Sequence, residues 1–211
     1  MTHQGTARFW TAWRTFKSCP RVFVISMLIL FASWVALELA VVALHRFGIV
    51  VWLVLHLVFL LLFSGLLVGC DAIALQAAHG EAPKLINLTA LLKRGPTFFL
   101  AFCIYAVAVV GGLALLVVPG IYVAVRYALF GQVLATKPAS ALEALRDAAT
   151  LSHGRWWTIC GTVLMAFLLN LAGAALLGVG LVITFPVSLL AISSLYLSLQ
   201  RSIPTSSESP A

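Results

Sequence analysis

Charged side chains are scarce in this sequence of 211 residues, which has thirteen Lys or Arg and six Asp or Glu. They make up 9% of the chain, against about a quarter in soluble domains. Hydrophobic residues make up 63%, and the mean hydropathy is +1.10. So few charges cannot cover the surface of a soluble protein of this size. The composition therefore excludes a soluble globular domain and predicts an integral, polytopic membrane protein.

Cysteine pairs and catalytic motifs are also lacking. Cys19, Cys70, Cys103 and Cys160 show neither CxxC nor CxxH spacing, which argues against a zinc site. The sequence has no HExxH, no phosphate loop, no paired-carboxylate metal motif and no GxSxG with a usable set of partners. We therefore expect no metal, no cofactor and no enzymatic activity. The net charge of +7 comes from residues beside apolar runs rather than from a basic domain, so we expect no nucleic-acid partner.

Long apolar runs predict an all-α fold of six transmembrane helices, arranged as three hairpins. A helix needs about 20 apolar residues to cross the hydrocarbon of a bilayer. We expect one transmembrane domain over residues 1–201, in which Pro119-Gly120 separates the third and fourth spans, and a disordered cytoplasmic tail over 202–211. The predicted spans cover residues 22–44, 48–69, 97–118, 121–136, 157–177 and 181–199.

The distribution of basic residues predicts the orientation. All but two lie on one side of the predicted spans; Arg46 lies on the other side and Arg126 lies inside a span. The positive-inside rule therefore places both termini in the cytoplasm. The residues on the predicted cytoplasmic side are Arg8, Arg14, Lys17, Arg21, Lys84, Lys93, Arg94, Lys137, Arg146, Arg155 and Arg201.

A segment with one apolar face precedes each hairpin, which predicts a cytoplasmic interfacial amphipathic helix three times over. The third begins with a capping box, Ser140 to Glu143. The alternative is that these segments are ordinary cytoplasmic loops. The apolar faces are predicted to consist of Phe9, Trp13 and Phe16, then Leu85, Leu88 and Leu92, then Leu142, Leu145 and Ala149.

Four polar residues fall inside four different spans and are the candidate functional residues. Glu38, His56, Arg126 and Asn170 are each predicted to lie roughly 9–12 Å below the outer ends of their spans, at 1.5 Å per residue. A Glu38–Arg126 ion pair with His56 and Asn170 as hydrogen-bond partners would satisfy all four. The pair could only fix the helix register, or Arg126 could hold a lipid headgroup or another small anion. A third possibility is that Arg126 extends alone to the outer interface.

Small residues and one further acid complete the set of candidates. Gly65 and Gly69 form a GxxxG unit, and Gly111 and Gly112 form a second smooth patch. Both patches permit close helix approach, within the chain or between chains, so the oligomeric state stays open. Asp71 is predicted to lie at the interface, facing Lys or Arg of an interfacial helix.

The fourth span and the segment after it resemble a known bacterial signature. The run Pro-Gly-Ile-Tyr at 119–122, Arg126, and the segments 144–148 and 151–157 resemble the pattern of YciC-like membrane proteins and of the membrane domain of glycerophosphoryl diester phosphodiesterases. Two positions depart: no acid stands in 134–138, and His153 replaces an arginine-like position. The matching residues are Pro119, Gly120, Tyr122, Arg126, Ala144, Leu145, Arg146, Leu151, Gly154 and Trp157.

The resemblance implies a multi-pass protein of the bacterial inner membrane, without the phosphodiesterase activity, because no such catalytic domain is present. The first hypothesis is a non-enzymatic protein that binds lipid headgroups or supports envelope homeostasis, with membrane lipid and other membrane proteins as partners. The alternative is a transporter, or a membrane subunit of one, that moves a small molecule or lipid. A lipid-modifying enzyme would have only Glu38 and His56 as acid and base.

Overall fold

The computed structural model describes residues 2–44, 48–175 and 180–202. All regular secondary structure within these ranges is helical, and six helical segments are long and apolar enough to cross a membrane. The predicted all-α polytopic membrane fold is therefore confirmed. Arg46 and the predicted tail beyond Ser202 lie outside the described residues. The helices are α1 (Thr2–Ser18), α2 (Pro20–Leu44), α3 (Ile49–His79), α4 (Ile86–Ala90), the 3₁₀ turn η2 (Leu92–Arg94), α5 (Gly95–Leu115), α6 (Val117–Tyr127), α7 (Phe130–Thr136), α8 (Ala141–Leu151), α9 (Trp156–Ala175) and α10 (Leu181–Gln200).

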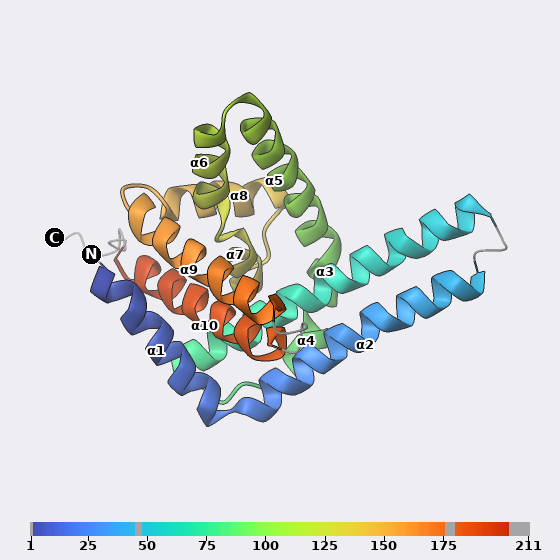
Figure 1. Ribbon diagram of the computed structural model, residues 1–211, viewed down its shortest axis with the longest axis horizontal. Coiled ribbons are helices and arrows are strands. Elements are labelled where there is room, and N and C mark those ends of the chain that lie inside the picture. Colours follow the sequence, from blue (N-terminus) through green and yellow to red (C-terminus); the bar gives the residue numbers. More distant parts are fainter. Residues whose placement is uncertain (1, 45–47, 176–179, 203–211) are drawn as a thin grey trace, which may run out of the picture.

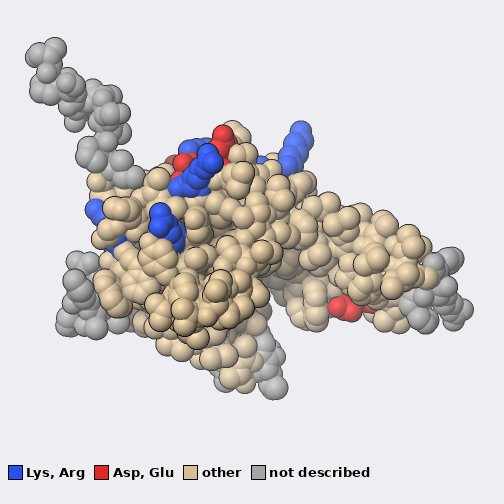
Figure 2. All heavy atoms as spheres, turned by 90° about the horizontal axis from the view of Figure 1, so that it is seen from above, with Lys and Arg blue, Asp and Glu red and all other residues tan. Residues whose placement is uncertain are grey.

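Three hairpins, α2–α3, α5–α6 and α9–α10, diverge from a shared core (Figure 1). The outer parts of α2 and α3 project away from the other helices, and most of their large apolar side chains are exposed there. Most of the charged side chains visible in Figure 2 lie along its upper side, away from the hairpin tips. The molecule thus combines a packed core near one charged side with apolar hairpins that spread from it.

The turn of the second hairpin lies earlier than predicted. Helix α5 ends at Leu115 and α6 begins at Val117, so Pro119 and Gly120 belong to the first turn of α6 instead of separating two spans. Proline is tolerated there because the first N–H groups of a helix have no intrahelical acceptor. The fourth span is also divided, since α6 ends at Tyr127 and α7 begins at Phe130.

The core consists of two adjoining hydrophobic clusters. In one, Phe9 and Phe16 of α1 pack with Phe23 of α2 and with residues of α3 and α10. In the other, α7 and α8 pack against α3, α5, α6 and α10, and Leu129 and Leu134 are fully buried. The apolar face predicted for residues 9–16 is therefore turned inward, where it fixes α1 to the bundle.

The other two segments that precede hairpins differ from their predictions. The second is a five-residue helix followed by a 3₁₀ turn, and of its predicted apolar face only Leu88 is buried. In α8 the contact face is rotated around the helix axis from the predicted one: Ala144, Leu145 and Ala148 are buried, whereas Leu142 is 56% exposed. Small alanines form this face because α8 lies close against α5, α6 and α7.

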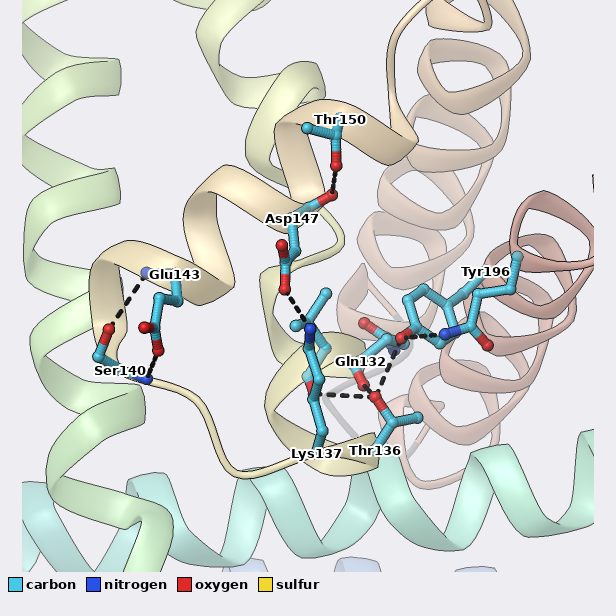
Figure 3. Close-up of polar contacts among 10 residues, drawn as sticks. Gln132, Thr136, Lys137, Ser140, Glu143, Asp147, Thr150 and Tyr196 are labelled. Carbon is cyan, nitrogen blue, oxygen red and sulfur yellow. Dashed lines mark hydrogen bonds and ion pairs between the residues drawn. The ribbon is translucent and has the colours of Figure 1, made fainter. Parts of the chain in front are cut away.

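Polar contacts fix α8 at its start and join it to α7 (Figure 3). Ser140 Oγ accepts a hydrogen bond from the Glu143 N–H at 3.3 Å, and Glu143 Oε2 accepts one from the Ser140 N–H at 2.8 Å. The predicted capping box is thus confirmed. Lys137, which follows α7, forms an ion pair of 2.6 Å with Asp147. This ion pair raises the pKa of Lys137.

Acid should release the cap of α8. The hydrogen bonds from Ser140 lower the pKa of Glu143 below its ordinary value of 4.5. A lowered folded-state pKa means that the stabilisation is present above the ordinary value and is lost as the pH falls through the folded-state value. We expect the thermal midpoint of the purified protein to fall more steeply below pH 4.5 than that of Glu143→Gln, whose side chain does not titrate. Parallel curves for the two proteins would contradict this prediction.

Candidate functional site

The four intramembrane polar residues do not form one layer. The ion pair Lys137–Asp147 is the only one within the described residues, so the predicted Glu38–Arg126 pair is wrong. Glu38 is exposed on α2, which projects away from α6 (Figure 1). His56 Nδ1 lies 3.0 Å from the Trp52 carbonyl oxygen, and Asn170 donates to Ser188 Oγ at 3.1 Å. Equal depth along the helices did not bring these side chains together, because the hairpins diverge.

Arg126 instead belongs to an aromatic cluster between α6 and α9. Its Nη1 donates to the hydroxyl of Tyr122 at 2.8 Å, and its Cζ lies 5.7 Å from the centre of the Tyr122 ring. The Tyr122 ring stacks on Trp156 at 6.5 Å, and Trp156 meets Trp157 edge-on at 4.7 Å. The cluster therefore joins Arg126 and Tyr122 of α6 to the two tryptophans at the start of α9.

The end of α8 fixes the position of Arg126. Ser152 Oγ donates to the main-chain carbonyl of Arg126 at 2.8 Å. Ser152 is buried, whereas His153, Gly154 and Arg155 immediately after it are exposed. Gly154 has φ of 73°, a left-handed conformation that favours glycine and that turns the chain from α8 into α9. The sequence predicted that Arg126 lies in a polar layer near the outer ends of the spans. In the structure it lies beside the junction of α8 and α9.

Two hydrogen-bond donors of this cluster have no acceptor. Arg126 Nε and Trp156 Nε1 are both buried, and neither has a hydrogen-bond partner within the described residues. A buried donor without an acceptor costs about 1–3 kcal/mol. The cluster is therefore short of hydrogen-bond acceptors, and no acidic side chain within the described residues forms an ion pair with Arg126.

Some residues of the family-like signature lie in this cluster, and others lie away from it. Gly120 lies very close to Gly112 of α5, since a Cβ on Gly112 would stand 2.9 Å from the Cα of Gly120. Pro119 and Leu151 lie in the first turn of α6 and at the end of α8. Ala144 and Leu145 of α8 are buried, while Arg146 and Trp157 are exposed. Tyr122, Arg126 and Trp157 of the signature thus belong to the cluster, whereas Pro119 and Gly120 lie at the α5–α6 contact and Arg146 is exposed.

A second polar site, between α3 and α7, was missed from the sequence. Asp71 is 7% exposed and Gln132 is 3% exposed, and Gln132 Nε2 donates to Asp71 Oδ1 at 2.9 Å. The prediction that Asp71 faces Lys or Arg at an interface is therefore wrong. A Cβ on Gly131 would stand 2.6 Å from Asp71 Oδ2, so the carboxyl group lies directly against the backbone of α7. The signal in the sequence was Gln132, a second polar residue inside an apolar span.

The glycine patches have different roles. Gly65 and Gly69 lie against the segment of Leu88 to Leu92, so this GxxxG unit serves contacts within the chain. Gly112 serves the α5–α6 contact, whereas nothing lies within 4 Å of a Cβ on Gly111.

The described part of the chain shows no metal site, and comparisons with known proteins give no relative from which a site could be transferred. Residues 2–44, 48–175 and 180–202 contain no group of three His, Cys, Asp or Glu that could hold a metal ion. Searches of protein-family models, curated proteins and solved structures find no match to the chain.

Proposed function

We propose that this integral membrane protein is not an enzyme and binds the phosphate group of a membrane lipid at Arg126, Tyr122 and Trp156. The observation that carries the proposal is that the Arg126 charge has no acidic partner in the described part of the chain, while Arg126 Nε and Trp156 Nε1 are buried without acceptors. A guanidinium offers planar, paired donors that match phosphate oxygens. Tyr and Trp are side chains that favour the headgroup region of a bilayer.

The resemblance to YciC-like proteins is consistent with this proposal. Three of the matching residues, Tyr122, Arg126 and Trp157, belong to the cluster, and the resemblance implies a bacterial inner membrane. The distribution of basic residues predicts that both termini lie in the cytoplasm. In that orientation the proposed ligand would be a phospholipid of the cytoplasmic leaflet, because the cluster adjoins the exposed residues between α8 and α9. Support of envelope homeostasis would follow from such binding.

Replacing Arg126 should release a bound lipid. We expect native mass spectrometry of the gently solubilised protein to detect a retained phospholipid, with occupancy reduced about tenfold in Arg126→Leu. That factor corresponds to the loss of one charge-assisted contact of about 1.4 kcal/mol. Lys93→Leu is the matched control, since it removes an exposed positive charge from η2. Equal occupancy in the wild type and Arg126→Leu, with both proteins folded, would refute the proposal.

Transport is the second candidate, and the buried Asp71–Gln132 contact favours it. Intramembrane carboxylates are costly and commonly mark transport pathways, and Asp71 lies in α3 with no cation within 4.0 Å in the described part of the protein. The test is movement of a fluorescent phospholipid between the leaflets of vesicles that contain the purified protein. Transfer that Asp71→Asn abolishes would favour a transporter over a binding protein.

An enzyme acting through Glu38 and His56 has less support. No hydrogen bond or ion pair joins these side chains, because His56 Nδ1 contacts the Trp52 carbonyl and Glu38 is exposed. Any lipid-modifying activity that disappears in both Glu38→Gln and His56→Ala would contradict our proposal.

A further inference from the structure

Glu38 is an acidic side chain without a partner on the apolar outer part of α2. It is exposed, and no hydrogen bond or ion pair joins it to any residue within 2–44, 48–175 and 180–202. It lies six residues before Leu44, the last residue of α2, which is roughly 9 Å along the helix axis. A carboxyl group at such a depth in a bilayer is costly, and charged groups there almost always face other protein or a water-filled cavity. In a single copy, lipid tails would surround it.

A second polar group lies on the same face of α2. Phe31, Trp34 and Glu38 share this face because they are spaced by three and four residues. Phe31 is 61% exposed and Trp34 is 49% exposed, and their ring centres are 6.4 Å apart. The indole N–H of Trp34 makes no hydrogen bond in the described part of the chain. Tryptophan favours the interface of a bilayer, yet Trp34 lies one helical turn deeper than Glu38. This face of α2 therefore presents two polar groups that lipid tails cannot satisfy.

The complementary side chain is on α3. His56 lies seven residues after Ile49, the first residue of α3, and so at nearly the same depth as Glu38. Its Nδ1 lies 3.0 Å from the Trp52 carbonyl oxygen. A carbonyl oxygen only accepts hydrogen bonds, so Nδ1 donates to it, and Nε2 has no partner among the described residues. Nε2 accepts a hydrogen bond from a protonated carboxyl group, or, when itself protonated, donates one to a carboxylate.

A second copy of the chain brings the two side chains together. Glu38 and His56 do not pair within one copy, because each lies on its own helix and no contact joins them. A two-fold axis along the membrane normal keeps every residue at its depth in the bilayer. Two hairpins packed face to face around this axis form a four-helix bundle, in which α2 of each copy lies opposite α3 of the other. Each Glu38 then faces the His56 of the other copy, which gives two contacts in one dimer.

We propose that two copies of this chain associate through the outer parts of α2 and α3, with Glu38 of each copy bound to His56 of the other. The hairpin projects from the other helices, so its faces are accessible to a second copy (Figure 1). The Arg126 cluster lies between α6 and α9, away from this surface, so the inference does not depend on the lipid proposed there.

Association of the full chain in vesicles tests the proposal. Protein tagged after Ala211 with a donor or an acceptor fluorophore is reconstituted together in phosphatidylcholine vesicles, and energy transfer is measured as the protein is diluted with lipid. We expect the wild type to dimerise, and Glu38→Leu and His56→Leu each to raise the dissociation constant about tenfold, because each removes both contacts. Glu81→Leu is the matched control, since it removes an exposed acid beyond the end of α3 and should change nothing. A monomeric wild type would overturn the proposal.

A mixture of the two variants distinguishes a contact between copies from an effect within one copy. A dimer of one Glu38→Leu chain with one His56→Leu chain retains one of the two contacts, whereas a dimer of either variant with itself retains none. Energy transfer between the two variants should therefore indicate about threefold tighter association than transfer within either of them. Random mixing of the two variants would overturn the proposal, even if both variants fold less well than the wild type.

Two further variants complete the test. Exchanging the residues, Glu38→His with His56→Glu, should return the dissociation constant toward the wild-type value, because the same contact forms with its ends reversed. Weaker association in Glu38→Leu but not in His56→Leu would mean that Glu38 binds elsewhere, which also overturns the inference. Arg126→Leu should leave the dimer unchanged. A dimer that forms without a lipid bound at Arg126 would remove only the proposed function.

Discussion

Gly69→Leu should displace α4 from α3 and lower the free energy of unfolding by about 3 kcal/mol, the upper part of the range for overpacked positions. A Cβ on Gly69 would collide with the carbonyl oxygen of Leu88 and stand 2.6 Å from its Cα. These are backbone atoms, so no change of rotamer can relieve the collision. The measurement is the thermal midpoint and the yield of monodisperse protein in detergent.

Two variants make this prediction specific. Gly111→Leu is the matched control, because nothing lies within 4 Å of a Cβ at that position of α5. It should be neutral or slightly stabilising, since leucine favours a helix more than glycine does. Adding Leu88→Ala to Gly69→Leu should not restore stability, because the obstacle is the Leu88 backbone. Rescue by that second change, or equal losses at Gly69 and Gly111, would contradict the packing described for α3.

The spans could be predicted from the sequence because crossing a bilayer requires only a sufficiently long apolar run along the chain, whatever the tertiary contacts. A run of about 20 apolar residues reveals itself by length and hydropathy alone, and six such segments are present in the structure. Helix ends were less predictable. Residues 70–79 of α3 are too polar to extend the apolar run, yet they continue the helix, because Cys70, Ile73 and Ala74 pack against the rest of the core.

Whether the polar candidates contact one another depends on more than the position of each residue along its span. The positions of Glu38 and Arg126 along their spans gave one coordinate, but a contact also requires the direction of each hairpin and the rotation of each helix. The hairpins diverge, so Arg126 meets Tyr122, four residues away, and Trp156 of α9 instead. Of the predicted contacts, those set by local spacing, such as the Ser140–Glu143 capping box, were predictable because they do not depend on tertiary packing.

The hydrogen bond between Asp71 and Gln132 could not be predicted from the sequence for the same reason. Asp71 follows the apolar run of α3 and Gln132 lies inside another apolar segment, but nothing in their 61-residue separation indicates that α3 and α7 are neighbours. Glycine at position 131 permits the contact, because a side chain there would occupy the place of the Asp71 carboxyl group. The buried pair is therefore specified by three residues whose relation appears only in the folded chain.

Gln132→Leu should destabilise the protein by about 3 kcal/mol, because it leaves the buried carboxyl group of Asp71 without its hydrogen-bond donor. Removing one partner of a buried polar pair is more costly than replacing both by apolar groups. The double variant Asp71→Leu with Gln132→Leu should therefore be more stable than Gln132→Leu alone, although it carries one more substitution. Thermal midpoints of the wild type, both single variants and the double variant complete the cycle. Strictly additive losses would mean that the two side chains do not interact, and the contact between α3 and α7 would then depend on Gly131 and the surrounding apolar residues alone.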